Sequence, residues 1–166
     1  MRARLVLVPM LAAAIGGAAA EPQQNTASLP SDGGSGWRVE CANDGKQLDC
    51  RTINRVLQRD TQQLIAAVAV RIPPDTRKPV LAIQLPLGIQ VTEGVTVRID
   101  DRQTEHYPVQ TCTQSGCIVG APLGDALVGA MRGGRELKVA FHNLTNQTIT
   151  VTMPLGGFAL AHDKIK

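Results

Sequence analysis

This chain has few aromatic residues, little net charge and no recognisable catalytic motif. Its aromatic side chains other than histidine are Trp37, Tyr107, Phe141 and Phe158. Four scattered rings do not make the stacking platform that binds single-stranded nucleic acid. The 17 basic residues outnumber the 14 acidic ones, but Arg2 and Arg4 fall within the first twenty positions. The remaining chain is nearly neutral and lacks the basic stripe of a nucleic-acid-binding domain, so we expect no nucleic-acid partner.

The residues that could act in catalysis are isolated from one another. Ser115 does not lie in the Gly-x-Ser-x-Gly motif of a nucleophile elbow. Asp100, Asp101 and Glu105 are near a predicted turn, where acidic side chains usually face solvent. No glycine pair has the strand–loop–helix context of a phosphate site. We therefore expect no catalytic residue, no cofactor and no enzymatic activity.

The three histidines, His106, His142 and His162, are dispersed along the chain. None forms the His-x-His or His-x-x-x-His spacing found in many metal sites. His106 and His142 could converge across strands with Asp100 or Asp101 to bind a metal ion. Exposed histidines at strand ends are the simpler interpretation, and the sequence predicts no metal site.

The first twenty residues have the three parts of a cleaved signal peptide. Arg2 and Arg4 form a basic start, residues 5–15 are apolar, and Ala18-Ala-Ala20 before Glu21 is an A-x-A cleavage site. The apolar run is shorter than the roughly 20 residues of a membrane-spanning helix. We expect cleavage between Ala20 and Glu21, export to the periplasm, and no transmembrane segment in the processed chain.

Residues 21–36 are rich in Pro, Gly, Ser and Gln and contain one large apolar residue, Leu29. Such a segment cannot bury enough apolar surface to offset its ordering entropy, which predicts a disordered linker. From Trp37 onward, short apolar runs alternate with turn residues. The predicted strands cover residues 37–41, 47–56, 63–72, 79–85, 89–91, 95–99, 106–112, 117–119, 136–141, 147–153 and 157–161.

Two details of this pattern are specific expectations. Asn43-Asp-Gly45 predicts a hairpin turn, and Ile53 is expected to point inward from the strand that follows it. Thr92-Glu-Gly94 predicts a second hairpin, which would join residues 89–91 to residues 95–99.

One helix is predicted, over residues 124–132. Asp125 can cap its start, Leu127, Ala130 and Met131 share one face, and Gly133-Gly134 follow its end. About ten short strands with one short helix indicate an all-β fold, an antiparallel β-sandwich that is immunoglobulin-like or related. A parallel sheet would need several helices between its strands. We predict one such domain over residues 37–166.

The four cysteines, Cys41, Cys50, Cys112 and Cys117, allow three disulfide connectivities. Local pairing of Cys41 with Cys50 and of Cys112 with Cys117 needs only hairpin geometry, and an exported chain meets an oxidising compartment. A four-thiolate zinc site is disfavoured because the Cys-x2-Cys knuckle is absent. A thioredoxin-like role for Cys112 and Cys117 would need Cys-x-x-Cys at a helix N-terminus. Two local disulfides are the prediction.

Several short motifs follow one another along the predicted domain. They are Trp37-x-Val-x-Cys41, Cys50, Leu85-Pro-Leu-Gly88, Gly94-Val-x-Val-x-Ile-Asp100, Cys112-x4-Cys117, Gly134-x-x-Leu-x-Val-x-Phe141 and Pro154-Leu-Gly-Gly-Phe158. This order resembles the invasion-associated locus B family of exported Gram-negative bacterial proteins. The resemblance implies a periplasmic or surface-associated β-rich domain with two disulfides, linked in some pathogens to host-cell invasion. It assigns no catalytic residue, and it does not extend to residues 21–36.

These observations favour a non-enzymatic binding or accessory protein of the cell envelope, whose partner is a protein or another envelope component. A different class, an envelope thiol–disulfide enzyme using Cys112 and Cys117 or a metal-binding protein using the dispersed histidines, is the alternative. The expected location is the periplasm, with secretion or attachment to the outer-membrane surface as the alternative. The sequence specifies neither the partner nor the oligomeric state.

Overall fold

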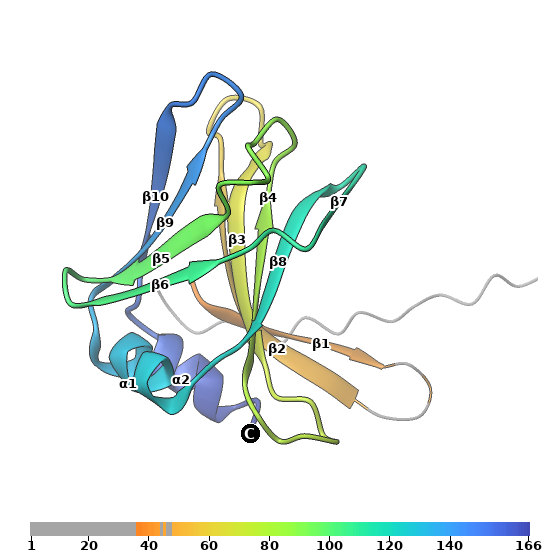
Figure 1. Ribbon diagram of the computed structural model, residues 1–166. Helices are drawn as coiled ribbons and strands as arrows, with labels where there is room; N and C mark the ends of the chain where they lie inside the picture. The colour runs from red at the N-terminus through yellow and green to blue at the C-terminus, as the bar shows by residue number, and fades with distance from the viewer. Residues whose placement is uncertain (1–35, 44, 46–47) are drawn as a thin grey trace, which may run out of the picture.

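The computed structural model describes residues 36–43, 45 and 48–166. The predicted signal peptide, its cleavage site between Ala20 and Glu21, and the predicted linker up to residue 35 lie outside the described residues. The described chain forms two antiparallel sheets, and two short helices lie together at one end of them (Figure 1). This arrangement confirms the all-β sandwich with two local disulfides that was predicted from the sequence.

The larger sheet has six strands in the order β1-β2-β3-β4-β8-β7. Their bounds are β1 Arg38–Asn43, β2 Leu48–Leu57, β3 Leu64–Arg71, β4 Val80–Leu85, β8 Gly116–Pro122 and β7 Thr111–Thr113. The first four strands pair in chain order, as expected for successive hairpins. The chain then leaves the sheet and returns at the far edge as β7 and β8, with β8 beside β4.

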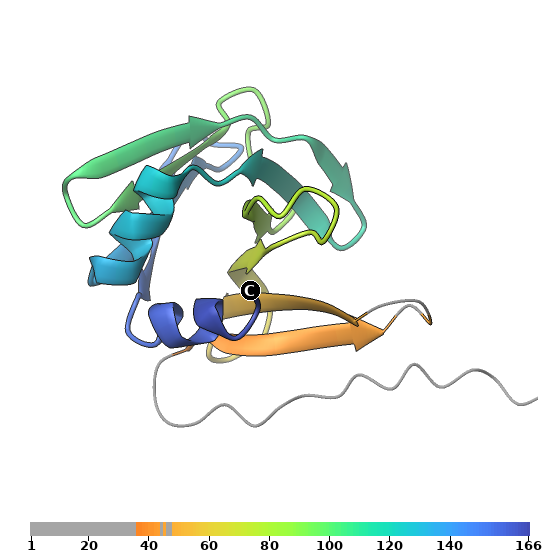
Figure 2. The same ribbon diagram turned by 90° about the horizontal axis from the view of Figure 1, so that it is seen from below.

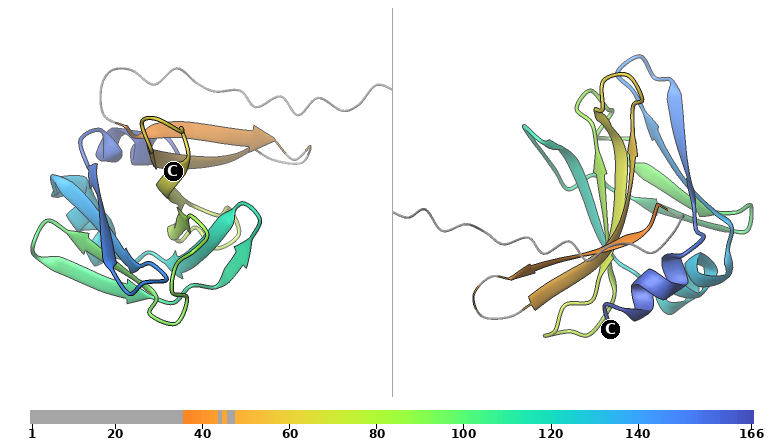
Figure 3. Two further views of the ribbon diagram at one scale, coloured as in Figure 1. Left: turned by 90° about the horizontal axis from the view of Figure 1, so that it is seen from above. Right: turned by 180° about the vertical axis from the view of Figure 1, so that it is seen from behind.

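The smaller sheet has four strands in the order β10-β9-β5-β6. Their bounds are β10 Thr148–Pro154, β9 Glu136–His142, β5 Val95–Ile99 and β6 Gln103–Tyr107. The predicted hairpin between residues 89–91 and 95–99 is wrong. Ile89 makes a single bridge to Asn143 beside β9, and the hairpin partner of Val95 is Tyr107. Instead of forming a hairpin, residues 86–94 cross from the larger sheet to the smaller one (Figure 3).

The core lies between the sheets and follows the period-two alternation of their strands. In β4, β5 and β9, alternate apolar residues are buried while their neighbours are more exposed. The buried members are Leu81, Ile83, Leu85, Val95, Val97, Ile99, Leu137, Val139 and Phe141. Burying one such side chain contributes about 1.5–3 kcal/mol. This layer therefore contributes substantially to the packing of the two sheets against each other.

Strand β3 is buried on both faces, from Ala66 to Val70. Val68 belongs to the main core, whereas Ala67 and Ala69 join Ile53 in a smaller cluster on the outer face of the six-stranded sheet. The prediction that Ile53 points into the main core is wrong, because β2 instead turns Thr52 and Asn54 inward.

The described part of the chain contains two helices, where the sequence predicted one. Helix α1, Asp125–Gly133, buries Leu127 and Met131 as predicted, but its N-cap is Gly124 and no side chain caps it. Helix α2, Phe158–Asp163, replaces the strand predicted at residues 157–161. Gly157 precedes it with φ of 82°, a left-handed conformation that turns the chain out of β10 and favours glycine. Seen from below, the two helices lie side by side across the open end between the sheets (Figure 2).

Trp37 fastens the start of the domain to this helix end. Its indole Nε1 donates a hydrogen bond to the carbonyl oxygen of Pro154 at 2.8 Å. Its ring meets Phe158 edge-on, with centroids 4.9 Å apart. The first strand and the last helix are thereby held against each other.

Candidate functional site

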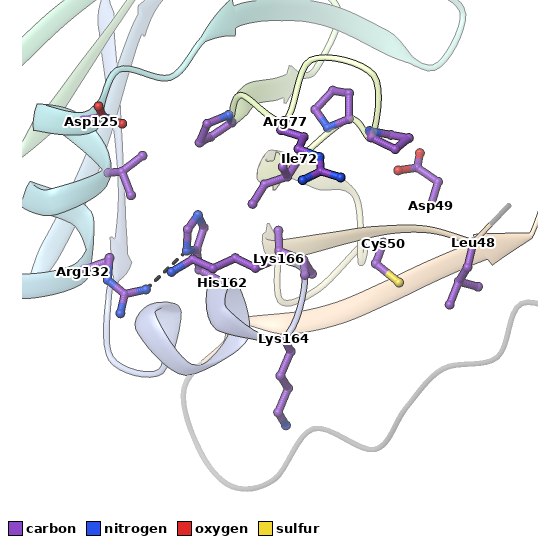
Figure 4. A pocket seen from close by; sticks show the side chains of 15 residues that line it. Leu48, Asp49, Cys50, Ile72, Arg77, Asp125, Arg132, His162, Lys164 and Lys166 are labelled. Carbon is purple, nitrogen blue, oxygen red and sulfur yellow. Dashed lines mark hydrogen bonds between the residues drawn. The ribbon is translucent and has the colours of Figure 1, made fainter.

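A cleft of about 850 Å³ opens at the helix end of the molecule. It lies between α1, the segment from α2 to the C-terminus, the start of β2, and the loop from β3 to β4 (Figure 4). Its apolar walls are formed by Leu48, Cys50, Ile72, Pro73, Pro74, Pro79, Val128 and Ile165. Its polar and charged lining residues are Asp49, Arg77, Asp125, Arg132, His162, Lys164 and Lys166.

The β3–β4 loop is shaped by its own sequence. Pro73 and Pro74 end β3 because proline has no backbone N–H for the ladder. The chain then turns back, and the Arg77 N–H donates to the Pro73 carbonyl oxygen at 2.8 Å. Arg77 itself has a φ of 53°, in the left-handed region that side-chain-bearing residues rarely adopt. This turn places Arg77 on the cleft wall, where Figure 4 shows its guanidinium directed toward the middle of the lining residues.

An ion-pair group fixes the opposite side of the cleft. The Arg132 guanidinium of α1 donates to both carboxylate oxygens of Asp163 in α2, at 2.7 and 3.0 Å. Lys166 lies 2.8 Å from the same carboxylate. The hydrogen bonds from Arg132 and then Lys166 hold the pKa of Asp163 well below its usual range. The carboxylate stays charged and cross-links the two helices.

His162 lies beside Arg132 of this group and is only 2% exposed. Its Nδ1 is 3.3 Å from a guanidinium nitrogen of Arg132, and its ring packs against Phe158. Because guanidinium only donates, Nδ1 acts as the acceptor and the ring proton resides on Nε2. Burial, followed by the charges of Lys166 and Arg132, lowers the pKa of His162 below its ordinary value of 6.5. The Nε2 atom is buried and has no hydrogen-bond partner among the described residues.

The two disulfides join directly opposed residues of two hairpins. Cys41 and Cys50 close β1–β2, and Cys112 and Cys117 close β7–β8. Cys50 lines the cleft, whereas Cys112 is exposed at the edge of the larger sheet. Since all four sulfurs form disulfides, the four-thiolate zinc site considered from the sequence is wrong. The Cys112–Cys117 bridge lies between strands and not at a helix N-terminus.

The structure does not bring the histidines and acids considered for a metal site together. His106 and His142 lie on strands of the smaller sheet and bond to Thr96 and Thr148. Asp100 lies beyond the opposite end of β5. It accepts hydrogen bonds from the backbone N–H groups of Arg135 and Glu136, which lower its pKa. No group of three or more potential metal ligands occurs among the described residues.

The buried environment of His162 in the cleft was not predicted from the sequence. This residue was expected to be an exposed strand-end side chain, and it is a buried helix residue. The available signal was the spacing of Phe158, Ala161, His162 and Ile165. Positions i, i+3, i+4 and i+7 share one face of a helix, and all four are buried.

Within residues 36–43, 45 and 48–166, no helix is both long enough and apolar enough to cross a membrane.

Known proteins resemble this chain in sequence and in fold. Over 131 residues it is 22% identical to the Invasion protein B homolog of Brucella abortus strain 2308, covering 78% of this chain and 75% of that protein. It is 27% identical over 107 residues to Invasion protein B of Bartonella bacilliformis, covering 63% of this chain and 55% of that one. The crystal structure of invasion associated protein B from Bartonella henselae has the same fold. The TM-score is 0.69 at 23% identity, covering 79% of this chain and 90% of that one.

The family model described as "Invasion associated locus B (IalB) protein" matches residues 37–166. The match contains both disulfides, both sheets and every residue that lines the cleft. The chain belongs to the invasion associated locus B family.

Proposed function

We propose that this chain is a non-enzymatic binding protein of the bacterial cell envelope and that it binds through the helix-end cleft. The observation that carries the proposal is the cleft itself. Its volume of about 850 Å³ falls within the roughly 300–1,000 Å³ of small-molecule sites. It combines apolar walls with charged groups that are fixed in place by the pairing of Arg132 with Asp163. A pre-shaped site of this kind loses little entropy when it binds.

The proposal includes the processing and location predicted from the sequence. The signal peptide of residues 1–20 is removed, residues 21–36 form a linker, and residues 37–166 form one binding domain. The mature protein works in the periplasm, with secretion or attachment to the outer-membrane surface as the alternative. Its partner is a protein or another envelope component, and it requires no cofactor.

The names of the relatives connect them with invasion. In this proposal, the chain contributes to such a process as an accessory factor that binds an envelope component.

The test compares capture from envelope extract by three immobilised forms of the mature chain. They are the natural sequence, Val128→Trp and Leu144→Trp. Val128 lines the cleft from α1, so a tryptophan there fills part of it. Leu144 is 72% exposed in the β9–β10 turn and serves as the matched control. We expect mass spectrometry to find a component that the natural sequence and Leu144→Trp retain and Val128→Trp loses.

Circular dichroism and thermal unfolding establish that each variant is folded before capture. A component retained equally by all three forms would place binding elsewhere, and a folded natural chain that retains nothing specific would contradict the proposed function.

A further inference from the structure

The charges around the cleft are unevenly satisfied. Among the described residues, Arg132 and Lys166 are paired with Asp163, and Asp49 lies 3.8 Å from Arg71. Asp125 lines the cleft from the start of α1 and has no cation within 4.0 Å in this set of residues. Arg77 has no carboxylate within 4.0 Å in the same set of residues. Lys164 also lines the cleft without an ion pair there, but Figure 4 shows its side chain directed away from the other labelled residues. Arg77 is therefore the unpaired cation that faces the cleft.

The surroundings of Arg77 are apolar. Ile72, Pro73, Pro74 and Pro79 come from its own loop, and Val128 and Ile165 face them from α1 and the C-terminal segment. A cation beside such walls selects a ligand that carries one anionic group on an apolar body. A guanidinium recognises a planar carboxylate particularly well, because it can donate two parallel hydrogen bonds.

The buried ring of His162 supplies a second, independent observation. Its Nε2–H has no acceptor among the described residues, although it belongs to a residue that lines the cleft. An unsatisfied buried donor is destabilising, and an acceptor that reaches it recovers the lost hydrogen bond. Since Nε2 is covered in this structure, an acceptor reaches it only when the side chains that cover it move. This donor is thus suited to a ligand that carries an oxygen acceptor.

We propose that the cleft binds a small amphipathic carboxylic acid. The carboxylate is held by Arg77 and by the Nε2–H group of His162, and the aliphatic body lies against the proline-lined wall. This inference rests on the proposed function, because it names the ligand class of the same site.

The first test uses calorimetry at neutral pH with three probes that have the same ten-carbon chain: decanoate, decanol and decyltrimethylammonium. We expect decanoate to bind the mature chain at least about tenfold more tightly than the other two, as a charge-assisted hydrogen-bonded pair provides. Equal binding of decanoate and decanol, or tighter binding of the cation, would overturn the inference.

The second test locates the anion. Arg77→Gln replaces the guanidinium by a shorter, neutral polar side chain at an exposed position, and we expect it to remove the preference for decanoate over decanol. Arg98→Gln, an exposed arginine on the smaller sheet, is the matched control and should leave that preference unchanged. An unchanged preference in folded Arg77→Gln would contradict the role given to Arg77.

The third test addresses the proposed hydrogen-bond donor, Nε2 of His162. His162→Gln retains an amide donor near the position of Nε2, whereas His162→Phe removes it. We expect His162→Gln to keep more of the decanoate affinity than His162→Phe. Equal affinities in two folded variants would remove His162 from the site and leave the carboxylate to Arg77 alone.

The failure of this inference can be distinguished from the failure of the proposed function. If no ten-carbon probe binds but envelope capture still depends on Val128, the cleft binds another class of ligand and only the inference fails. If neither probe binding nor cleft-dependent capture is found, both fail.

Discussion

The β1–β2 and β7–β8 hairpins each carry a disulfide between directly opposed residues, with Cα atoms 4.0 and 3.9 Å apart. Their surroundings differ. Around the first, Cys41 is buried, α2 packs against both strands, and Cys50 lines the cleft. The second is at the edge of the sheet, where all three residues of β7 are exposed. The comparison indicates that one bridge supports a wall of the cleft and the other joins a short edge strand to its neighbour.

The largest effect is expected from removing the packing that distinguishes the first hairpin. Phe158 is fully buried against Trp37. Phe158→Ala should lower the free energy of unfolding by about 3–5 kcal/mol, the usual range for deleting a buried aromatic ring. Leu160→Ala in the same helix is the control, because Leu160 is 74% exposed and its loss should change stability by less than about 0.5 kcal/mol. Denaturant unfolding measures both, and equal effects would show that α2 does not support the hairpin.

Removing each disulfide in turn tests the comparison directly. In the chain-entropy model, the double substitutions Cys41→Ser/Cys50→Ser and Cys112→Ser/Cys117→Ser should each destabilise the fold by about 2–3 kcal/mol, slightly more for the longer loop. The binding readouts should separate them, since loss of the first bridge weakens capture by the cleft and loss of the second does not.

The same pair of bridges also tests the alternative of a thiol–disulfide enzyme. We expect a mild reductant to open Cys112–Cys117 first, because Cys112 is exposed and Cys41 is buried. Thiol labelling with mass spectrometry follows the order of opening. Rapid, reversible exchange of Cys112–Cys117 with a protein dithiol would favour the enzymatic alternative, and slow opening without turnover would count against it.

A smaller, pH-dependent effect comes from Glu40, which joins the strands of the first hairpin. Its carboxylate accepts hydrogen bonds from Arg55, Arg38 and Arg51. Arg55 is the largest cause of the fall in the pKa of Glu40 from 4.5 to about 2. A lowered pKa stabilises the folded chain above pH 4.5, and this contribution is lost as the pH falls toward 2.

Glu40→Gln should therefore lower the free energy of unfolding by about 1 kcal/mol at pH 7. The difference from the natural sequence should vanish near pH 2. Urea unfolding at several pH values measures this dependence, and Asp101→Gln, which removes an exposed carboxylate, is the control. A constant difference across the range would mean that the arginines act through packing and not through charge.

Much of the fold could be predicted because local chemistry determined it. The alternation in β4 and β9, the prolines after β3 and the Gly133-Gly134 pair at the end of α1 each indicate structure over a few residues. The predictions that failed concern residues whose orientation or strand pairing depends on a partner distant in the sequence. Ile53 is buried on the outer face of the larger sheet, because its pairing with Ala69 of β3 places it in the smaller cluster. Val95 pairs with Tyr107 although Thr92–Gly94 has a hairpin composition. Residues 157–161 were assigned to a strand because the helical spacing extends beyond them to Ile165.

The candidate site was less predictable than the fold. Its lining residues come from β2, the β3–β4 loop, α1 and the C-terminal segment, and they share no motif. Nothing in the sequence around Arg77 identifies the α1 and C-terminal residues that face it across the cleft. A cleft of this kind arises from tertiary packing, and sequence periodicity does not report it.

The hydrogen bond from Trp37 to Pro154 spans 117 residues, and it bears on the order in which the protein is completed. The cleft is lined by residues from Leu48 to Lys166, so it is complete only after the last part of the chain has docked. Loop closure over such a separation is slow compared with local hairpin formation. Trp37 is the chain's single tryptophan, and its fluorescence should reach the native value only when α2 docks. A native Trp37 signal while α2 amides still exchange freely with solvent would contradict this order. The topology of the chain itself therefore delays completion of the cleft until the last helix docks.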